Sequence, residues 1–72
     1  MPRIHVSVVS PEEAFNGNAE FWCGRELMAV TVLEDGQLQL RIDPRPDDRP
    51  WLLETSSLAA SLAEAERLIG SH

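Results

Sequence analysis

The sequence of 72 residues contains no lysine, no tyrosine and a single cysteine, Cys23. One cysteine cannot form an intrachain disulfide, which is typical of a protein of the reducing cytoplasm. No stretch approaches the roughly 20 consecutive apolar residues of a membrane span. The start, Met-Pro-Arg-Ile-His-Val, lacks the apolar run of a signal peptide. We therefore expect a cytoplasmic protein with no membrane contact.

Basic residues are scarce: six arginines stand against twelve acidic residues, for a formal charge of -6. The arginines are spread singly along the chain, at Arg3, Arg25, Arg41, Arg45, Arg49 and Arg67. A nucleic-acid binder needs clustered Lys and Arg to neutralise the phosphates, so the charge distribution argues against direct nucleic-acid binding. The acidic surface suits a basic protein partner, or simply solubility. Arginine without lysine indicates a GC-rich, bacterial genome.

Residues that carry catalysis or metal binding are equally few. Cys23 lies near Arg25, but a nucleophile needs a base, and the histidines are His5 and the terminal His72. One cysteine and two distant histidines lack the ligand spacing of zinc sites. No Gly-rich phosphate loop or nucleophile elbow is present. We predict no catalytic residue, metal or cofactor, with Cys23 a half-buried structural residue and His5 exposed on a strand.

An enzyme or small-ligand carrier is the competing class of protein. The acidic pairs 12–13, 34–35 and 47–48 all fall at predicted turns or loops, where carboxylates serve capping and solvation. A ligand pocket usually needs roughly 300 Å³ or more, which a chain this short can provide most easily at a dimer interface. Such a site is the alternative to a binding module.

The first part of the chain predicts a strand followed by a helical turn. Ile4, Val6 and Val8 alternate with other residues, which indicates a strand over about residues 3 to 9. Ser10-Pro11-Glu12-Glu13 is a capping-box arrangement that would begin a helical turn. Gly17 would end it, and a plain loop is the alternative.

A second strand is predicted over residues 19–23, followed by a two-residue type II′ turn at Gly24-Arg25. Three cross-strand pairs follow from this turn: Cys23 with Glu26, Trp22 with Leu27, and Phe21 with Met28. Residues that face each other across two strands lie on the same side of the sheet.

Residues 27–43 form the clearest hairpin pattern, and two turns are possible in it. A two-residue turn at 35–36 places Val30 and Val32 opposite the polar Arg41 and Gln39. A three-residue loop at 34–36, with Gly36 at a bulge, gives apolar pairs instead. These pairs are Met28 with Ile42, Val30 with Leu40 and Val32 with Leu38. We therefore predict the three-residue loop.

The last part of the chain predicts a stiff connector, a short strand and a helix. Residues 43–50 contain three prolines and five charges, which indicates an exposed rigid loop. A short strand is expected over 51–55, then a helix capped by Ser56 or Ser57 and ended by Gly70. The helix has an apolar stripe of Leu58, Leu62, Ala65, Leu68 and Ile69. Its polar side carries Ser61, Glu64 and Arg67.

Together these elements predict one α+β domain over residues 1–72, a small antiparallel β-meander of about four to five strands with one C-terminal helix packed on one face. The other face has no helix to cover it. In the predicted register it carries Trp22, Leu27, Ala29, Thr31, Leu33 and Arg41, which we take as candidate partner-binding residues. Three alternatives stay open for this face: the 11–16 turn or the proline loop covers it, it forms a homodimer, or it binds another protein.

The order of a meander followed by a helix resembles that of HicB-type antitoxins and, with the turn at Pro11 counted, of double-stranded-RNA-binding domains. The basic helix start of the second family is absent, because this chain has Ser57-Leu58-Ala59-Ala60 there. RNA binding is therefore not implied. The first resemblance implies an acidic inhibitor that masks a basic partner. We expect a noncatalytic protein-interaction or regulatory module.

Overall fold

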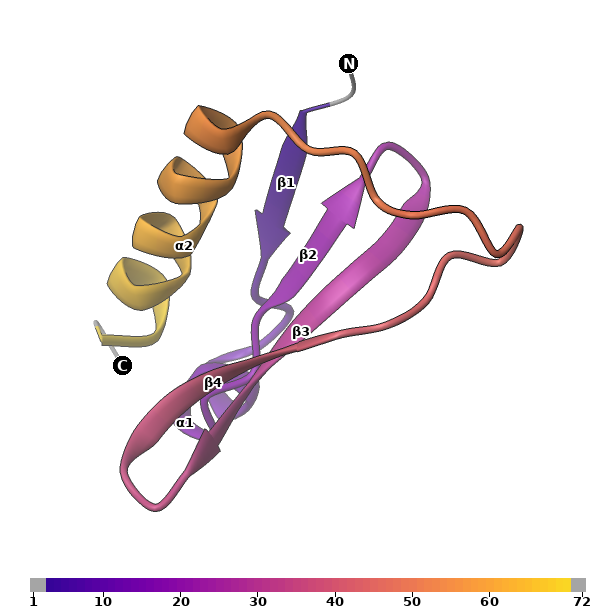
Figure 1. Ribbon diagram of the computed structural model, residues 1–72. Coiled ribbons are helices and arrows are strands. Elements are labelled where there is room, and N and C mark those ends of the chain that lie inside the picture. The colour runs from indigo at the N-terminus through magenta and orange to yellow at the C-terminus, as the bar shows by residue number, and fades with distance from the viewer. Residues whose placement is uncertain (1–2, 71–72) are drawn as a thin grey trace.

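The computed structural model describes residues 3–70 as a four-stranded antiparallel sheet, in the order β1-β2-β3-β4, with two helices (Figure 1). The elements are β1 (Ile4–Ser7), α1 (Pro11–Phe15), β2 (Glu20–Cys23), β3 (Glu26–Glu34), β4 (Gln37–Ile42) and α2 (Thr55–Gly70). The predicted α+β meander with a C-terminal helix is confirmed. His72, considered above as a possible base, lies outside the described residues.

Helix α1 begins as its capping sequence predicts. The Ser10 side chain accepts a hydrogen bond from the backbone N–H of Glu13 at 3.2 Å. In return, Glu13 Oε2 accepts the backbone N–H of Val9 at 3.2 Å, one residue before the cap. Gly17, with a φ of 79°, directs the chain away from the helix. The plain-loop alternative is therefore wrong.

The β2–β3 hairpin contains a bulge that the sequence did not predict. The two pairs nearest the turn are as predicted, Cys23 with Glu26 and Trp22 with Leu27. The next pair joins Phe21 to Ala29, so the predicted pair of Phe21 with Met28 is wrong. One extra residue of β3, Met28, is accommodated here. Met28 and Ala29 are both fully buried, so the bulge interrupts the alternation of side chains.

The β3–β4 hairpin closes with a two-residue turn, so the predicted three-residue loop is wrong. Leu33 pairs with Leu38, and Asp35 and Gly36 form the turn with φ values of 53° and 78°. Two positive φ values are typical of a type I′ turn, which matches the twist of the flanking strands. The prediction failed because it assumed unbroken alternation from Met28 onward, whereas the bulge places Met28 on the side of Ala29.

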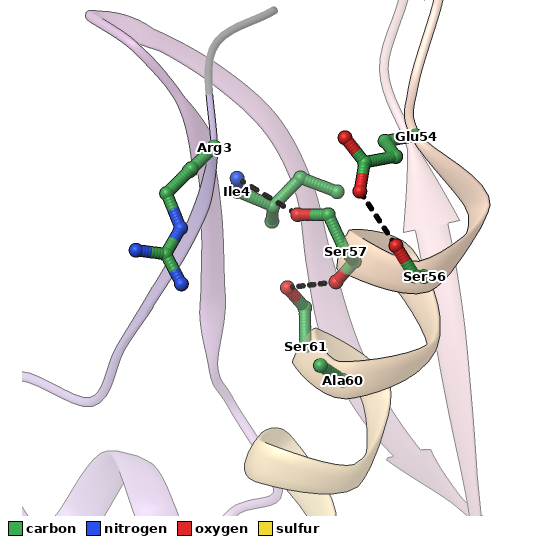
Figure 2. Close-up of a pocket in the computed structure, with 7 residues that line it drawn as sticks. All are labelled: Arg3, Ile4, Glu54, Ser56, Ser57, Ala60 and Ser61. Atoms are coloured by element: carbon green, nitrogen blue, oxygen red, sulfur yellow. Dashed lines mark hydrogen bonds between the residues drawn. The ribbon is translucent and has the colours of Figure 1, made fainter.

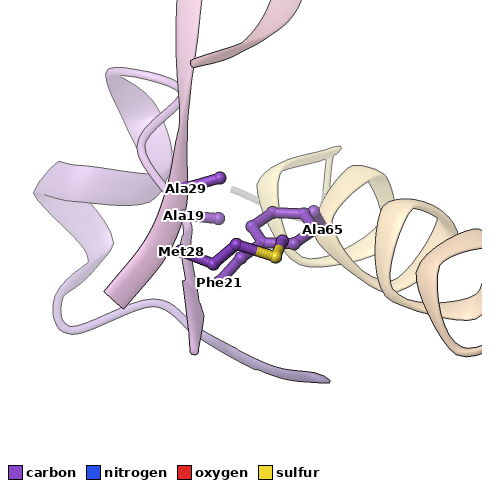
Figure 3. Packing of buried hydrophobic residues seen from close by; sticks show 5 residues of the cluster. All are labelled: Ala19, Phe21, Met28, Ala29 and Ala65. Atoms are coloured by element: carbon purple, nitrogen blue, oxygen red, sulfur yellow. The ribbon is translucent and has the colours of Figure 1, made fainter. Parts of the chain in front are cut away.

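The hydrophobic core lies between the sheet and α2. Figure 3 shows the buried side chains of the sheet pointing toward Ala65 of α2. The fully buried members are Ala19, Phe21, Met28, Ala29 and Ala65. Half-buried residues packed around them are Ile4, Val6, Val8, Cys23, Leu40, Trp51, Leu53, Leu58 and Ile69. Cys23 is a free, half-buried thiol against this core, as predicted.

Helix α2 begins earlier than predicted and is rotated relative to the expected stripe. It starts at Thr55, so Ser57 is not a cap; its Oγ instead accepts the backbone N–H of Ile4 at 3.4 Å (Figure 2). Ser61, expected on the polar side, is only 6% exposed, whereas Leu62 is 37% exposed. Ser61 Oγ donates to the Ser57 carbonyl oxygen at 2.7 Å, which removes most of the cost of burying the hydroxyl.

The segment after β4 folds back onto the α2 side of the sheet without forming the predicted strand at 51–55. Trp51 Nε1 donates to the Asp43 carbonyl oxygen at 2.8 Å. The Arg45 guanidinium lies over the Trp51 ring, 5.3 Å from its centroid, and forms an ion pair with Glu26 at 3.4 Å. These contacts hold both ends of the proline-rich segment to the sheet.

A buried threonine links the start of β2 to β3, and its removal should be costly. Thr31 Oγ1 donates to the Gly17 carbonyl oxygen and accepts the Ala19 N–H, both at 2.7 Å. We expect Thr31→Val to lower the free energy of unfolding by about 1–3 kcal/mol, because two buried backbone groups lose their partner. Urea unfolding measures the loss. Thr31→Ser, which keeps the hydroxyl, should lose much less; equal losses would contradict this role.

Gly17 and Gly36 provide a matched test of a close approach. Their φ values, 79° and 78°, are the same, so alanine costs similar backbone strain at both. A Cβ at Gly17 would lie 2.5 Å from Leu33 Cβ, whereas one at Gly36 meets nothing within 4 Å. We expect Gly17→Ala to lower the melting temperature clearly more than Gly36→Ala. Equal decreases would show that Leu33 moves freely aside.

Candidate interaction surfaces

The six predicted partner-binding residues do not form one surface. Ala29 and Thr31 are buried on the α2 side of the sheet, with 0% and 3% of their surface exposed. Leu33 follows them on that side and is 46% exposed. Trp22, Leu27 and Arg41 lie on the opposite side. The grouping was wrong because the bulge at Met28 reverses the alternation between Leu27 and Ala29.

We call the side of the sheet opposite α2 the open face. Cross-strand partners share a face, so the register identifies its members. They are His5, Ser7, Glu20, Trp22, Leu27, Val30, Val32, Glu34, Gln37, Gln39 and Arg41. His5 is exposed, as predicted. The sequence analysis paired Val30 with Leu40 and Val32 with Leu38. The preference of Asp-Gly for two-residue turns was the signal that would have paired them with Arg41 and Gln39 instead.

Trp22 belongs to an apolar strip on the open face together with Leu27, Val30 and Val32, all of which are half-buried. It pairs with Leu27 on one side and His5 on the other. Its indole Nε1 donates to Glu20 Oε1 at 3.4 Å, and the ring is half-buried. The alternative that the proline loop covers this face has no support in the packing, since Arg45 of the loop lies over Trp51, which packs against the core on the α2 side.

Helix α1 borders one end of the open face and forms an acidic hollow with it. The hollow has a volume of about 270 Å³, and its lining includes Glu13, Glu20, Val30, Val32 and Arg41. Arg41 is already balanced by Asp43, with Nε and Oδ1 3.2 Å apart. Two carboxylates beside two valines suit a long basic side chain, which carries an aliphatic stem and a charged end.

A second apolar surface follows the β3–β4 hairpin on the α2 side. Figure 1 shows that the tip of this hairpin extends beyond the end of α2. We call this surface the hairpin stripe. It consists of Leu33, Leu38, Leu40 and Ile42. Ile42 is 57% exposed and Leu33 is 46% exposed, whereas Leu38 and Leu40 are half-buried and Leu40 packs against the core. The stripe is therefore only partly covered.

A polar pocket of about 520 Å³ lies between β1 and the start of α2 (Figure 2). It is lined by Arg3, Ile4, Glu54, Ser56, Ser57, Ala60 and Ser61. Its serine hydroxyls already serve the fold: Ser56 donates to Glu54 at 2.6 Å, Ser57 accepts from β1, and Ser61 donates within α2. The pocket therefore offers a ligand few free and aligned polar groups.

The surface charges of α2 include a close ion pair. Arg67 donates two hydrogen bonds to Glu64, the shorter at 2.6 Å. These hydrogen bonds lower the pKa of Glu64 and raise that of Arg67. Both groups are exposed to solvent, so this pair belongs to the helix surface and lies outside the open face.

Within residues 3–70, no three His, Cys, Asp or Glu side chains are placed to hold a metal ion. Neither of the described helices is long and apolar enough to cross a membrane. Comparisons of the chain with protein-family models, curated proteins and solved structures found no match.

Proposed function

We propose that this protein is a small noncatalytic module that binds a partner protein through its open face. The observation that supports the proposal is the strip of Trp22, Leu27, Val30 and Val32 on the side of the sheet opposite α2. A chain with one long helix can cover one face of its sheet, and apolar surface left on the other usually marks an interaction site. Trp22 gives this strip a large aromatic anchor, the residue type most enriched at binding hot spots.

The charge of the molecule favours a basic partner. The chain carries -6 overall, and Glu13 and Glu20 line the hollow at the end of the open face. A partner that inserts an arginine or lysine there would place its aliphatic stem against Val30 and Val32. The specific form of this proposal is an acidic cytoplasmic inhibitor that masks a basic surface, in the manner of an antitoxin.

The apolar strip is tested with Trp22→Asp against Leu52→Asp, which places the same charge at a leucine that is 72% exposed. The wild type is used to capture the partner from the source cells, and the purified partner is then titrated against all variants. We expect Trp22→Asp to weaken binding at least roughly tenfold, since losing a buried tryptophan costs more than about 1.4 kcal/mol. Leu52→Asp should bind normally.

Circular dichroism establishes that the variants are folded. If Trp22→Asp unfolds, Val32→Lys provides the second test, because it places a cation beside the hollow at a half-buried strand position. Binding unchanged in a folded Trp22→Asp or Val32→Lys protein would refute the proposed surface.

The acidic hollow is tested by removing its charges without changing its shape. Glu13→Gln with Glu20→Gln removes two carboxylates from the lining, and glutamine can still accept the N–H of Val9 and of the Trp22 indole. Glu12→Gln with Glu66→Gln removes the same charge from exposed positions elsewhere. We expect only the first pair to weaken binding and reduce its salt dependence. Equal effects would mean that net charge alone attracts the partner.

A further inference from the structure

We propose that a second copy of this chain pairs with β4 at its open edge. The two copies would form one continuous antiparallel sheet, with four strands from each copy and a twofold axis at Leu40. This inference concerns the edge and the hairpin stripe, and it does not depend on the partner proposed for the open face.

The backbone of β4 has hydrogen-bonding groups available for another strand. Asp43 N–H donates to the Met28 carbonyl oxygen at 2.9 Å, so the backbone N–H of Asp43 points toward β3. Because the direction alternates along an antiparallel strand, Leu38, Leu40 and Ile42 point their N–H and C=O groups away from β3. In the described part of the chain, these three residues have no backbone hydrogen bond beyond the sheet ladder.

The other edge of the sheet is less available. β1 lies against α2, and the N–H of Ile4 is already bound by Ser57 Oγ. No described element packs along the outer edge of β4, and its charged residue, Arg41, is paired with Asp43 of the same chain. The free edge therefore belongs to the strand that carries three of the four residues of the hairpin stripe, Leu38, Leu40 and Ile42.

The sequence of β4 is complementary to itself in one register. Pairing Leu40 with Leu40 of the second copy places Leu38 against Ile42 and Gln39 against Arg41. In this register each residue whose backbone groups point away from β3 faces a residue of the same kind in the second copy. The side chains of these residues extend the hairpin stripe across the axis. Moving the strands to pair Arg41 with Arg41 would oppose like charges. Moving them the other way would place Ile42 opposite Gly36 in the turn.

The charge distribution also favours β4 as the contact between two acidic molecules. Each copy carries -6, yet residues 37–42 contain no carboxylate. Arg41 is balanced by Asp43 in its own chain, so two copies of Arg41 near the axis bring little uncompensated charge. A twofold contact at this strand therefore avoids the repulsion that most of the surface would generate.

Sedimentation equilibrium from about 1 µM to about 1 mM tests the association, a range that spans weak to moderate dimers. We expect the wild type to dimerise with increasing concentration. Ile42→Lys should weaken the dimer at least roughly tenfold by placing a charge on the hairpin stripe at a position already 57% exposed. Leu52→Lys is the matched control and should dimerise normally. A wild type that stays monomeric throughout would overturn the proposal.

Disulfide cross-linking tests the register in a Cys23→Ala background. Gln39 faces Arg41 of the second copy, and both positions are exposed. A mixture of Gln39→Cys and Arg41→Cys chains should therefore cross-link under mild oxidation much faster than either chain alone. Faster self-linking of one chain, or no preference for the mixture, would overturn this register. Trp22→Asp should leave the dimer intact, so failure of this proposal can be distinguished from failure of the open-face proposal.

Discussion

The bulge at Met28 decides which side of the sheet each residue of β3 occupies. It directs Met28 and Ala29 to the same side, where both are buried beneath α2 together with Phe21. A regular strand would have sent one of them to solvent, since side chains otherwise alternate. With the bulge, the core contains a large flexible side chain at its centre, and the valines that follow are placed on the open face. The core and both candidate interaction surfaces therefore depend on one extra residue in one strand.

Limited cover explains why two apolar surfaces remain. Helix α2 packs along β1, and the segment at Trp51 and Leu53 adds cover near the other end of the core. A short chain buries a smaller share of its surface than a large one, and here both the open face and the hairpin stripe are left. Binding through either surface would bury apolar area that folding alone does not. The open face offers an aromatic anchor beside carboxylates, whereas the hairpin stripe includes three residues of β4, the strand with free backbone groups.

Local signals in the sequence predicted local structure well. The capping box at Ser10, the left-handed residue at Gly17 and the glycine-first turn at Gly24 all formed as expected, because each depends on residues within one turn of chain. The candidate site was predicted only in part: Trp22, Leu27 and Arg41 share the open face, but Ala29 and Thr31 are buried. The face on which Ala29 and Thr31 lie depends on the bulge at Met28, which the sequence did not predict. Similarly, burial of Ser61 depends on how α2 rotates against β1, which its own periodicity does not specify.

The sequence by itself determined the element order, the α+β class, the acidic charge and the absence of a cysteine partner for a disulfide, since these follow from composition and short-range pattern. Only the tertiary structure decided where the β2–β3 ladder is interrupted, and hence which residues of β3 occupy the core and open faces. The physical reason is that one bulged residue moves every later side chain of β3 to the opposite face of the sheet. Packing of Met28 and Phe21 under α2 selects the bulged arrangement over the regular one. A two-residue type I′ turn at Asp35-Gly36 then fits the twist of the strands that this packing has placed.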